Sequence, residues 1–184
     1  AKTYVLAMTL RPITAYDTDW KLVCLLCTVL PTLENGLARL EDLPDGKKGV
    51  ALTYTLQPKA TWGDGVPVTS ADVAFTIAAG QNAQSGFGDT EVFKRIRAVD
   101  IMDDKSFVVH FDRVTYDYNA LAVEPLPVHL ERPLFDQGAA EYRNRTLYDT
   151  APNTPGLYFG PSRITEVSRG SHVVLERNPT WYGP

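Results

Sequence analysis

The chain has 184 residues, enough for one good-sized domain or two small ones, and its 44% hydrophobic and 22% charged residues are ordinary for a folded soluble protein. Its formal net charge of −4 argues against a nucleic-acid partner, because nucleic acids usually require a basic face. No apolar run reaches the roughly 18 residues of a membrane-spanning helix. The first residues, AKTYVLAM, lack the features of a signal peptide.

The first part of the chain predicts short strands. Thr3–Met8 has the composition of a strand, and Pro12 interrupts it shortly afterwards. The segments ITAY (Ile13–Tyr16) and KLV (Lys21–Val23) flank a polar turn, so we expect them to pair as a hairpin. Leu22–Leu30 is almost continuously apolar, and periodicity alone does not distinguish strand from helix there.

Two cysteines, Cys24 and Cys27, form a C-x-x-C pair inside the apolar run LVCLLCTVL. A structural zinc site needs four ligands, and the three histidines (His110, His129 and His172) show no ligand spacing with the pair. A redox-active pair usually has a polar, electropositive setting, which the flanking leucines do not provide. We expect either two buried thiols or a local disulfide.

The middle of the chain predicts a strand, a tight turn and a helix in succession. Ala51–Gln57 alternates apolar and polar residues, as in a strand with one buried face. The sequence W-G-D-G-V-P that follows contains a strong turn signal. Thr69 and Asp72 then form the T-x-x-D pattern of a capping box, which predicts a helix over Ser70–Ala79. Gly80 is expected to end that helix.

The second half predicts two hairpins and little helix. The first hairpin pairs Ala98–Met102 with Ser106–Phe111, and the second pairs Arg163–Val167 with His172–Glu176. Helical spacing is present in Thr90–Arg97, and the long segment between the hairpins contains one short helical candidate around Tyr118–Val123.

A gap-free stretch of the chain resembles the signature region of the family 5 extracellular solute-binding proteins of ABC importers. The family pattern is W-x-D-G-x-P-[VL]-T-[AS]-x-D-[VA]-x-F-[TS]. The matching positions are Trp62, Asp64, Gly65, Pro67, Thr69, Asp72, Val73, Phe75 and Thr76. Most of these residues have architectural explanations, so we expect Trp62 to anchor the turn by packing.

The end of the chain carries a second resemblance to the same family, whose pattern there is G-P-Y-x-[VL], followed further on by G-x-x-[VI]-x-L-x-x-N-P-x-Y-W-G. The matching positions are Gly160, Pro161, Gly170, Val174, Leu175, Glu176, Arg177, Asn178, Pro179 and Gly183. The chain departs from the pattern where Tyr158 and Phe159 replace a Gly-Thr pair, where Ser162 replaces a tyrosine, and where Trp181 and Tyr182 invert the aromatic order. The loss of the glycine before Gly160 is a departure that bears on the local backbone shape.

The resemblance covers nearly the whole chain and implies an α+β fold, with a mixed sheet, hairpins and a few helices. Such proteins are longer, with two lobes that close around a ligand. The resemblance therefore implies that residues 1–184 are the N-terminal part of lobe I, without the second lobe and the returning strands. Some apolar surface is then expected to be exposed.

No catalytic or cofactor motif is present: the sequence lacks a G-x-S-x-G elbow, an H-E-x-x-H pair, a P-loop and a G-x-G-x-x-G loop. We therefore predict no enzyme activity, no metal site and no cofactor. Arg143 and Arg145 could bind an anion, although a solvated loop is the more ordinary interpretation.

The predicted ligand-binding residues are aromatic or polar residues on loops, namely Tyr116, Tyr118, Asn119, Tyr158 and Phe159. The resemblance places their segments near the cleft and hinge, while packing against another part of the protein would explain them equally well.

The resemblance implies binding of a small solute, with a peptide as the preferred class, and delivery to an ABC permease from a periplasmic or other extracytoplasmic location. Nickel, sugar and opine ligands remain open, as does a ligand-sensing domain of a regulator with the same fold. We expect this chain alone to bind solute weakly or not at all, because half of the cleft wall belongs to the second lobe.

Overall fold

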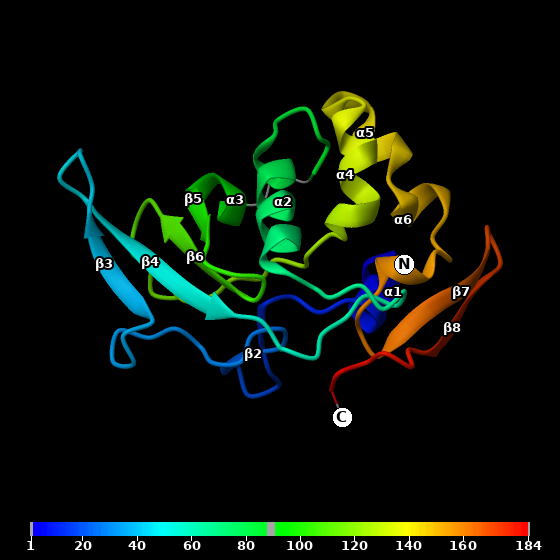
Figure 1. Cartoon of the computed structure of the whole chain (residues 1–184), viewed down its shortest axis with the longest axis horizontal. Helices are drawn as coiled ribbons and strands as arrows, with labels where there is room; N and C mark the ends of the chain where they lie inside the picture. The colour runs from blue at the N-terminus through cyan, green and yellow to red at the C-terminus, as the bar shows by residue number, and fades with distance from the viewer. Residues whose placement is uncertain (1, 88–90, 184) are drawn as a thin grey trace.

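A computed structural model describes residues 2–87 and 91–183. Figure 1 shows a four-stranded sheet at one end, helices and a hairpin at the other end, and helix α2 between them. The elements in chain order are α1 (Lys2–Thr9), β1 (Thr14–Tyr16), β2 (Leu22–Cys24), β3 (Ala38–Asp42), β4 (Lys48–Thr55), α2 (Ser70–Gln81), α3 (Glu91–Arg95), β5 (Ile96–Ile101), β6 (Ser106–Phe111), α4 (Val128–Asp136), α5 (Ala139–Arg145), α6 (Leu147–Thr150), η1 (Pro155–Leu157), β7 (Ser162–Ser168) and β8 (His172–Arg177).

The four-stranded sheet has the order β3-β4-β6-β5, and β1-β2 and β7-β8 form separate two-stranded sheets. Every pairing between these strands is antiparallel, so the predicted α+β class and all three predicted hairpins are confirmed. In β4, Leu52 and Tyr54 lie opposite Val109 and Phe107 of β6, and all four side chains are fully buried. This alternation is what the sequence pattern predicted for the strand.

A buried carboxylate, Asp72, connects the turn before α2 to the start of α4. One of its oxygens, Oδ2, accepts hydrogen bonds from the backbone N–H of Thr69 at 2.7 Å and from Nε1 of Trp62 at 3.4 Å. The other, Oδ1, accepts from the backbone N–H of Val128 at 2.8 Å. The predicted capping box is therefore present, and Trp62 is fully buried, as expected for an anchor. Burial raises the pKa of Asp72, and these hydrogen bonds oppose the rise.

A lysine of the β5–β6 turn holds the loop that precedes α2. The Lys105 ammonium donates to the carbonyl oxygens of Val68 at 2.7 Å, Ala60 at 3.3 Å and Gln57 at 3.4 Å. Carbonyl groups outside regular helices and strands need partners of this kind when they are shielded from water. Partial burial lowers the pKa of Lys105.

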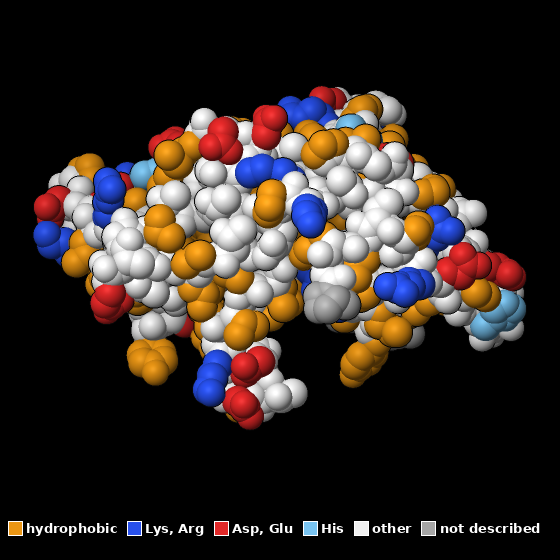
Figure 2. Space-filling view, turned by 60° about the horizontal axis from the view of Figure 1, so that its bottom comes forward, with side chains coloured by type: hydrophobic (Ala, Val, Ile, Leu, Met, Phe, Trp, Pro, Cys, Tyr) orange, Lys and Arg blue, Asp and Glu red, His pale blue; other side chains and the backbone are white. Residues whose placement is uncertain are grey.

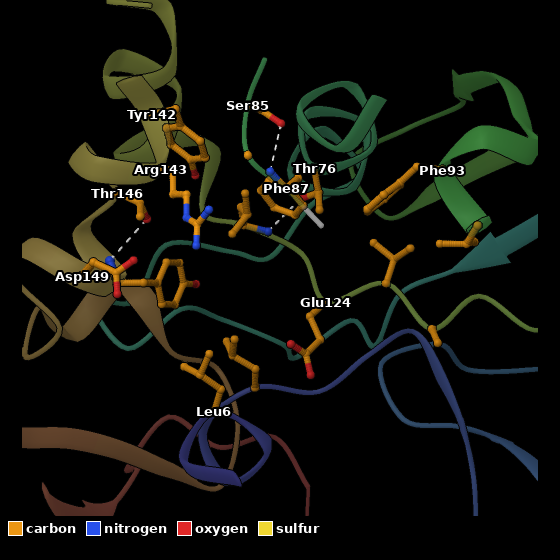
Figure 3. A pocket seen from close by; sticks show the side chains of 17 residues that line it. Leu6, Thr76, Ser85, Phe87, Phe93, Glu124, Tyr142, Arg143, Thr146 and Asp149 are labelled. Atoms are coloured by element: carbon orange, nitrogen blue, oxygen red, sulfur yellow. Dashed lines mark hydrogen bonds between the residues drawn. The ribbon is translucent and has the colours of Figure 1, made fainter. Parts of the chain in front are cut away.

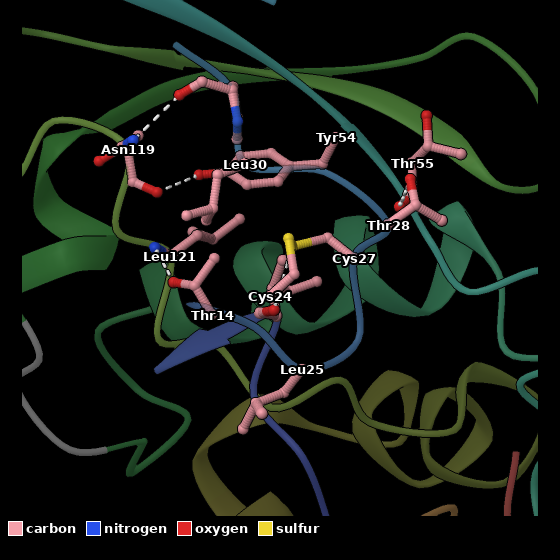
Figure 4. The surroundings of a disulfide bond; sticks show 12 residues. Thr14, Cys24, Leu25, Cys27, Thr28, Leu30, Tyr54, Thr55, Asn119 and Leu121 are labelled. Atoms are coloured by element: carbon pink, nitrogen blue, oxygen red, sulfur yellow. Dashed lines mark hydrogen bonds between the residues drawn. A yellow bond between two sulfur atoms is a disulfide. The ribbon is translucent and has the colours of Figure 1, made fainter. Parts of the chain in front are cut away.

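A disulfide joins Cys24, the last residue of β2, to Cys27 and closes a short loop directly after the β1–β2 hairpin (Figure 4), which settles the alternatives left open by the sequence. Cys27 is fully buried. The hairpin is tied to the rest of the core through β1, because the backbone N–H of Thr14 donates to the Leu121 carbonyl at 3.1 Å and the N–H of Leu121 donates to the Thr14 hydroxyl at 2.8 Å.

The C-terminal segment returns to the first residues of the chain. The backbone N–H of Gly160 donates to the Thr9 carbonyl at 2.8 Å, and a Cβ at position 160 would lie 2.5 Å from the Thr9 backbone. Only glycine fits this approach. The Asn178 side chain donates to the Gly160 carbonyl at 2.9 Å, and the Tyr182 hydroxyl donates to the Leu25 carbonyl at 2.8 Å. The sequence elements of the second resemblance therefore fix the end of the chain against its beginning.

Three sequence predictions are wrong. The segment predicted as a strand at Thr3–Met8 is helix α1, which satisfies its own backbone and lies against β7 without a strand partner. The predicted helix around Tyr118–Val123 is absent, because Leu121 and Val123 accept backbone hydrogen bonds from residues at the start of β1. Helix α2 continues past Gly80, whose missing side chain makes room for the Phe93 ring.

Other predictions were incomplete. The helix expected over Thr90–Arg97 corresponds to α3 and the start of β5, with Thr90 outside the described residues. Helices α4, α5 and α6 were not predicted, in part because Pro133 interrupts the pattern inside α4. In the described part of the chain, no helix is long and apolar enough to cross a membrane.

Replacing Asp72 by alanine should lower the free energy of unfolding by about 3 kcal/mol, because it leaves buried N–H groups of Trp62, Thr69 and Val128 without an acceptor. Asp72→Asn keeps one acceptor oxygen and should lose less. Urea unfolding of both variants measures the effect, with the exposed Asp136→Ala as the control. A loss for Asp72→Ala no larger than that of the control would contradict this role.

Removing the disulfide with the double variant Cys24→Ala/Cys27→Ala should destabilise the chain by about 2 kcal/mol, as loop-closure entropy predicts for so short a loop. Thermal unfolding with and without reductant measures the effect. Reductant should lower the midpoint of the natural chain and leave the double variant unchanged. Equal midpoints for the natural chain under both conditions would show that the bridge adds no stability.

Candidate functional site

Two of the predicted ligand-binding residues, Tyr158 and Phe159, are fully buried. The Phe159 ring packs edge-on against Trp62 with the centroids 4.9 Å apart. The Tyr158 hydroxyl donates to the Pro152 carbonyl at 2.5 Å, and its ring lies 6.0 Å from that of Tyr148. Both side chains therefore pack in the core of the chain in this arrangement, and their role in ligand binding stays a prediction.

The other three predicted residues lie on the segment after β6 but do not converge. The Asn119 side chain donates to the Pro31 carbonyl at 3.0 Å, and its own backbone carbonyl accepts from the Tyr54 hydroxyl at 2.8 Å (Figure 4). The Tyr118 hydroxyl accepts a hydrogen bond from the Leu33 backbone at 3.4 Å. Tyr116 is fully exposed. Their role in ligand binding stays a prediction.

Other apolar side chains are also exposed, as expected from the sequence. The largest exposed fractions, besides that of Tyr116, are 84% for Trp20 and 83% for Tyr4. Figure 2 shows hydrophobic side chains spread over one face of the molecule, between projecting loops that carry charged residues. Trp20 also has a positive φ of 58°, which is unusual for a residue with a side chain.

A cavity of about 440 Å³ lies between α1, α2, the segment after α2, and α5–α6 (Figure 3). Its size is in the usual range for small-molecule sites, and its lining is mostly apolar with a few polar groups. The lining residues are Leu6, Leu10, Thr76, Ser85, Gly86, Phe87, Val92, Phe93, Ala122, Val123, Glu124, Leu126, Tyr142, Arg143, Thr146, Tyr148 and Asp149. We regard this cavity as the candidate functional site.

The wall that carries Glu124 is fixed by helix α2. The Thr76 hydroxyl donates to the Asp72 carbonyl and accepts from the backbone N–H of Leu126, both at 2.7 Å. Because Val128 is held by the Asp72 carboxylate, residues 126–128 follow α2 closely. Pro125 and Pro127 further restrict this segment.

The opposite wall is fixed by a second buried carboxylate, Glu131. It accepts a hydrogen bond from the Tyr142 hydroxyl at 2.6 Å and another from the backbone N–H of Leu147 at 3.0 Å. These contacts join α4 to α5 and α6. Burial and the nearby Glu131 raise the pKa of Tyr142 well above its ordinary value, so this tyrosine remains a hydrogen-bond donor.

Charged groups of both signs face the cavity. Figure 3 shows the Glu124 carboxylate and the Arg143 guanidinium extending into it from different sides, with Asp149 at a third position. Partial desolvation raises the pKa of Glu124, and the positive charge of Arg11 opposes this rise. The cavity can therefore accept a small molecule with an apolar body and charged ends.

Sequence reasoning found only part of this site. It placed a functional segment after β6, but the residues that line the cavity are 122–124 and 126 rather than Tyr116–Asn119. It named Arg143 and Arg145 as possible anion ligands on a loop, whereas both lie on helix α5 and only Arg143 lines the cavity. Glu124 was missed, although a single carboxylate within the apolar run ALAVEPLPV is a signal that could have found it.

The described residues offer no group of three or more histidine, cysteine, aspartate or glutamate side chains that could hold a metal ion. His110 makes close contacts with Glu41 at 2.9 Å and Asp100 at 3.0 Å, but these carboxylates contact different nitrogens of its ring.

Comparison with known proteins identifies the family of the chain. The sequence profile of bacterial extracellular solute-binding proteins, family 5, matches residues 33–184. Oligopeptide-binding protein OppA of Mycobacterium tuberculosis is 27% identical over 141 residues, which is 72% of this chain and 22% of that protein. The chain thus spans about a fifth of the length of the curated relatives that it matches.

Solved structures agree over nearly the entire chain. The oligopeptide-binding protein from Thermus thermophilus, complexed with a pentapeptide, has a TM-score of 0.83 and 28% identity, covering 97% of this chain and 33% of that one. AppA from Bacillus subtilis, at 17% identity and a TM-score of 0.73, covers 98% of this chain and 32% of that one and shares the fold. With the profile matching more than half of its residues, the chain belongs to family 5 of the bacterial extracellular solute-binding proteins.

Proposed function

We propose that this chain is part of a protein that binds peptides for import by an ABC transporter. The observation that carries the proposal is the similarity to the Thermus thermophilus oligopeptide-binding protein, which was solved with a pentapeptide. At 28% identity over 97% of this chain, that similarity extends beyond the fold alone. The mostly apolar cavity with charged groups at Glu124 and Arg143 suits a peptide.

We further propose that residues 1–184 are the N-terminal part of lobe I. Support comes from the coverage, since the chain matches about a third of each related structure. Capture would then occur by closure of a second lobe over the cavity, followed by delivery to a membrane permease. Tyr116 remains a proposed ligand contact because its ring is free of the core.

We also propose binding without chemical conversion, in the periplasm or another extracytoplasmic compartment. Family membership supports a solute-binding role, and the disulfide suits an oxidising compartment. Nickel, sugars and opines are the alternative ligands. Titrations of the chain with nickel and with a sugar allow the binding of these ligands to be compared with the binding of a peptide.

The test is a titration of isotope-labelled chain with peptide, followed by NMR. The tripeptide Ala-Leu-Ala should shift the amide signals of residues that line the cavity, such as Phe87 and Arg143. Since one lobe supplies only part of the contact surface, we expect a dissociation constant of about 1 mM or weaker. Matched titrations with an oligosaccharide and with Ni²⁺ serve as comparisons.

Shifts caused by the sugar or by nickel, with none from any peptide at about 10 mM, would contradict peptide binding. Micromolar peptide affinity would instead contradict the requirement for a second lobe and support binding by this chain alone.

We expect the Glu124 side chain to lower the free energy of unfolding near pH 7. Such a cost is expected of a residue that is retained for binding and not for stability. Its folded-state pKa is raised, so its contribution to stability is fully present below the unfolded-state pKa of about 4.3 and is lost as the pH rises through the folded-state value. Glu124→Gln should therefore unfold at a higher temperature than the natural chain near pH 7, with the difference shrinking toward about pH 3. Thermal unfolding at both pH values measures this.

The matched control is Glu141→Gln, a glutamate on α5 that does not line the cavity. Its midpoint should change little at either pH. A Glu124→Gln variant less stable than the natural chain near pH 7 would show that this carboxylate supports the fold instead.

A further inference from the structure

The tip of the β1–β2 hairpin carries a solvent-exposed tryptophan in an unfavourable backbone conformation. The Trp20 side chain is 84% exposed, and its φ is 58°, the one positive value among the described residues other than glycine. Glycine adopts this region without steric cost, whereas a bulky residue there is strained. Because neither the strain nor the exposure of a large ring stabilises the chain, the two together indicate a role outside the fold.

The turn that carries Trp20 is held by its own hydrogen bonds. The Asp17 carboxylate accepts from the backbone N–H groups of Asp19 and Lys21, both at 2.9 Å. The backbone N–H of Trp20 donates to the Asp17 carbonyl at 3.1 Å, and the N–H of Asp17 donates to the Lys21 carbonyl at 2.9 Å. The disulfide directly after β2 restrains the base of the hairpin. The backbone of the tip is therefore ordered before any partner binds.

A second aromatic ring lies beside Trp20. Tyr16, the last residue of β1, is 48% exposed, and its ring centroid is 6.4 Å from that of Trp20 with the ring planes inclined by 46°. Figure 1 shows the hairpin, in blue near the label β2, on the side of the molecule away from α4 and α5. Two adjacent exposed rings offer the negative faces of their π systems to a group that approaches the tip.

The charges next to Trp20 are mostly negative. Asp17 and Asp19 are both exposed, and Lys21, the basic residue of the turn, lies across the hairpin from Asp17. In the described part of the chain, the Asp19 carboxylate forms no ion pair within 4.0 Å. A carboxylate beside an aromatic ring attracts a cation through both its charge and the ring face. A guanidinium fits best, because it stacks on aromatic rings and pairs with carboxylates.

These features favour one class of partner over the others. An anionic protein surface, or a membrane rich in anionic lipids, would be repelled by Asp17 and Asp19. A neutral apolar surface would cover the Asp19 carboxylate without replacing its contacts with water. A positively charged side chain satisfies the carboxylate and covers the Trp20 ring at the same time.

We propose that Trp20, Tyr16 and Asp19 form a docking site for an arginine side chain on the surface of a partner protein. The guanidinium stacks on the Trp20 ring and pairs with the Asp19 carboxylate, and the Tyr16 ring borders the site. The site lies outside the cavity and does not depend on which solute the cavity binds.

The test is an NMR titration of the isotope-labelled chain with the peptide acetyl-Gly-Arg-Gly-amide, whose guanidinium is its only charge. The indole N–H signal of Trp20 should shift, with a dissociation constant of about 1 to 10 mM, as expected for one exposed cation–π contact with a nearby carboxylate. The analogue with citrulline, which has a neutral urea group, should bind at least about fivefold more weakly. Raising the salt concentration from about 0.02 M to about 0.5 M should weaken binding of the arginine peptide.

Variants separate binding from folding. Trp20→Gly should weaken binding of the arginine peptide about fivefold or more and should unfold at the same or a higher temperature, because glycine accepts the positive φ. Asp19→Asn should weaken binding about threefold at low salt and have no effect at high salt. Tyr116→Ser, which removes a fully exposed ring elsewhere, is the matched control and should leave the affinity unchanged.

Equal affinity for the arginine and citrulline peptides would overturn the assignment of a cationic partner. A Trp20→Gly variant that binds as tightly as the natural chain, or that unfolds at a lower temperature, would overturn the role of the ring. Phosphatidylcholine vesicles that shift the Trp20 signal when the arginine peptide does not would overturn the proposal in favour of a membrane surface. Each of these results leaves solute binding unaffected, since cavity residues such as Phe87 give separate signals.

Discussion

The structure depends on the burial of one carboxylate, Asp72. Its side chain is 1% exposed, yet it has no cationic partner in direct contact among the described residues and is stabilised by N–H groups of the turn, the helix start and the following segment. Hydrogen bonds from several donors can hold a charge in the core where a single ion pair often gives little net stability. Because the donors come from residues 62, 69 and 128, three separate parts of the chain share one anchor.

That anchor also shapes the cavity. From α2, the Thr76 hydroxyl binds Leu126 and the Asp72 carboxylate binds Val128, so the segment carrying Glu124 has little freedom. On the other side, Glu131 fixes α5 and α6 through Tyr142 and Leu147, and with them Arg143. The two buried carboxylates thereby position two charged side chains on facing walls. Preorganisation of this kind reduces the ordering that a ligand must impose when it binds.

The parts of the fold that depend on local sequence patterns could be predicted from the sequence. Alternation indicated β4, turn residues indicated the hairpins, and the T-x-x-D pattern indicated the start of α2. Prediction failed where contacts between distant parts of the chain determine the structure. Helix α1 has the composition of a strand but no strand partner, and Leu121 and Val123 are not helical because their carbonyls accept hydrogen bonds from Thr14 and Ile13. The site was only partly predictable for the same reason. Tyr158 and Phe159 follow a short turn, and only the tertiary structure shows that they fill the core.

Binding of a solute in the cavity between Glu124 and Arg143 can be located directly by intermolecular nuclear Overhauser effects. The measurement is made between the leucine methyl groups of Ala-Leu-Ala and the isotope-labelled chain. We predict contacts to the ring protons of Phe87 and Tyr148 and to the methyl groups of Leu6, all of which line the cavity. Contacts to the exposed rings of Tyr116 or Trp20 in their place would contradict a cavity site and move the binding surface to the loops.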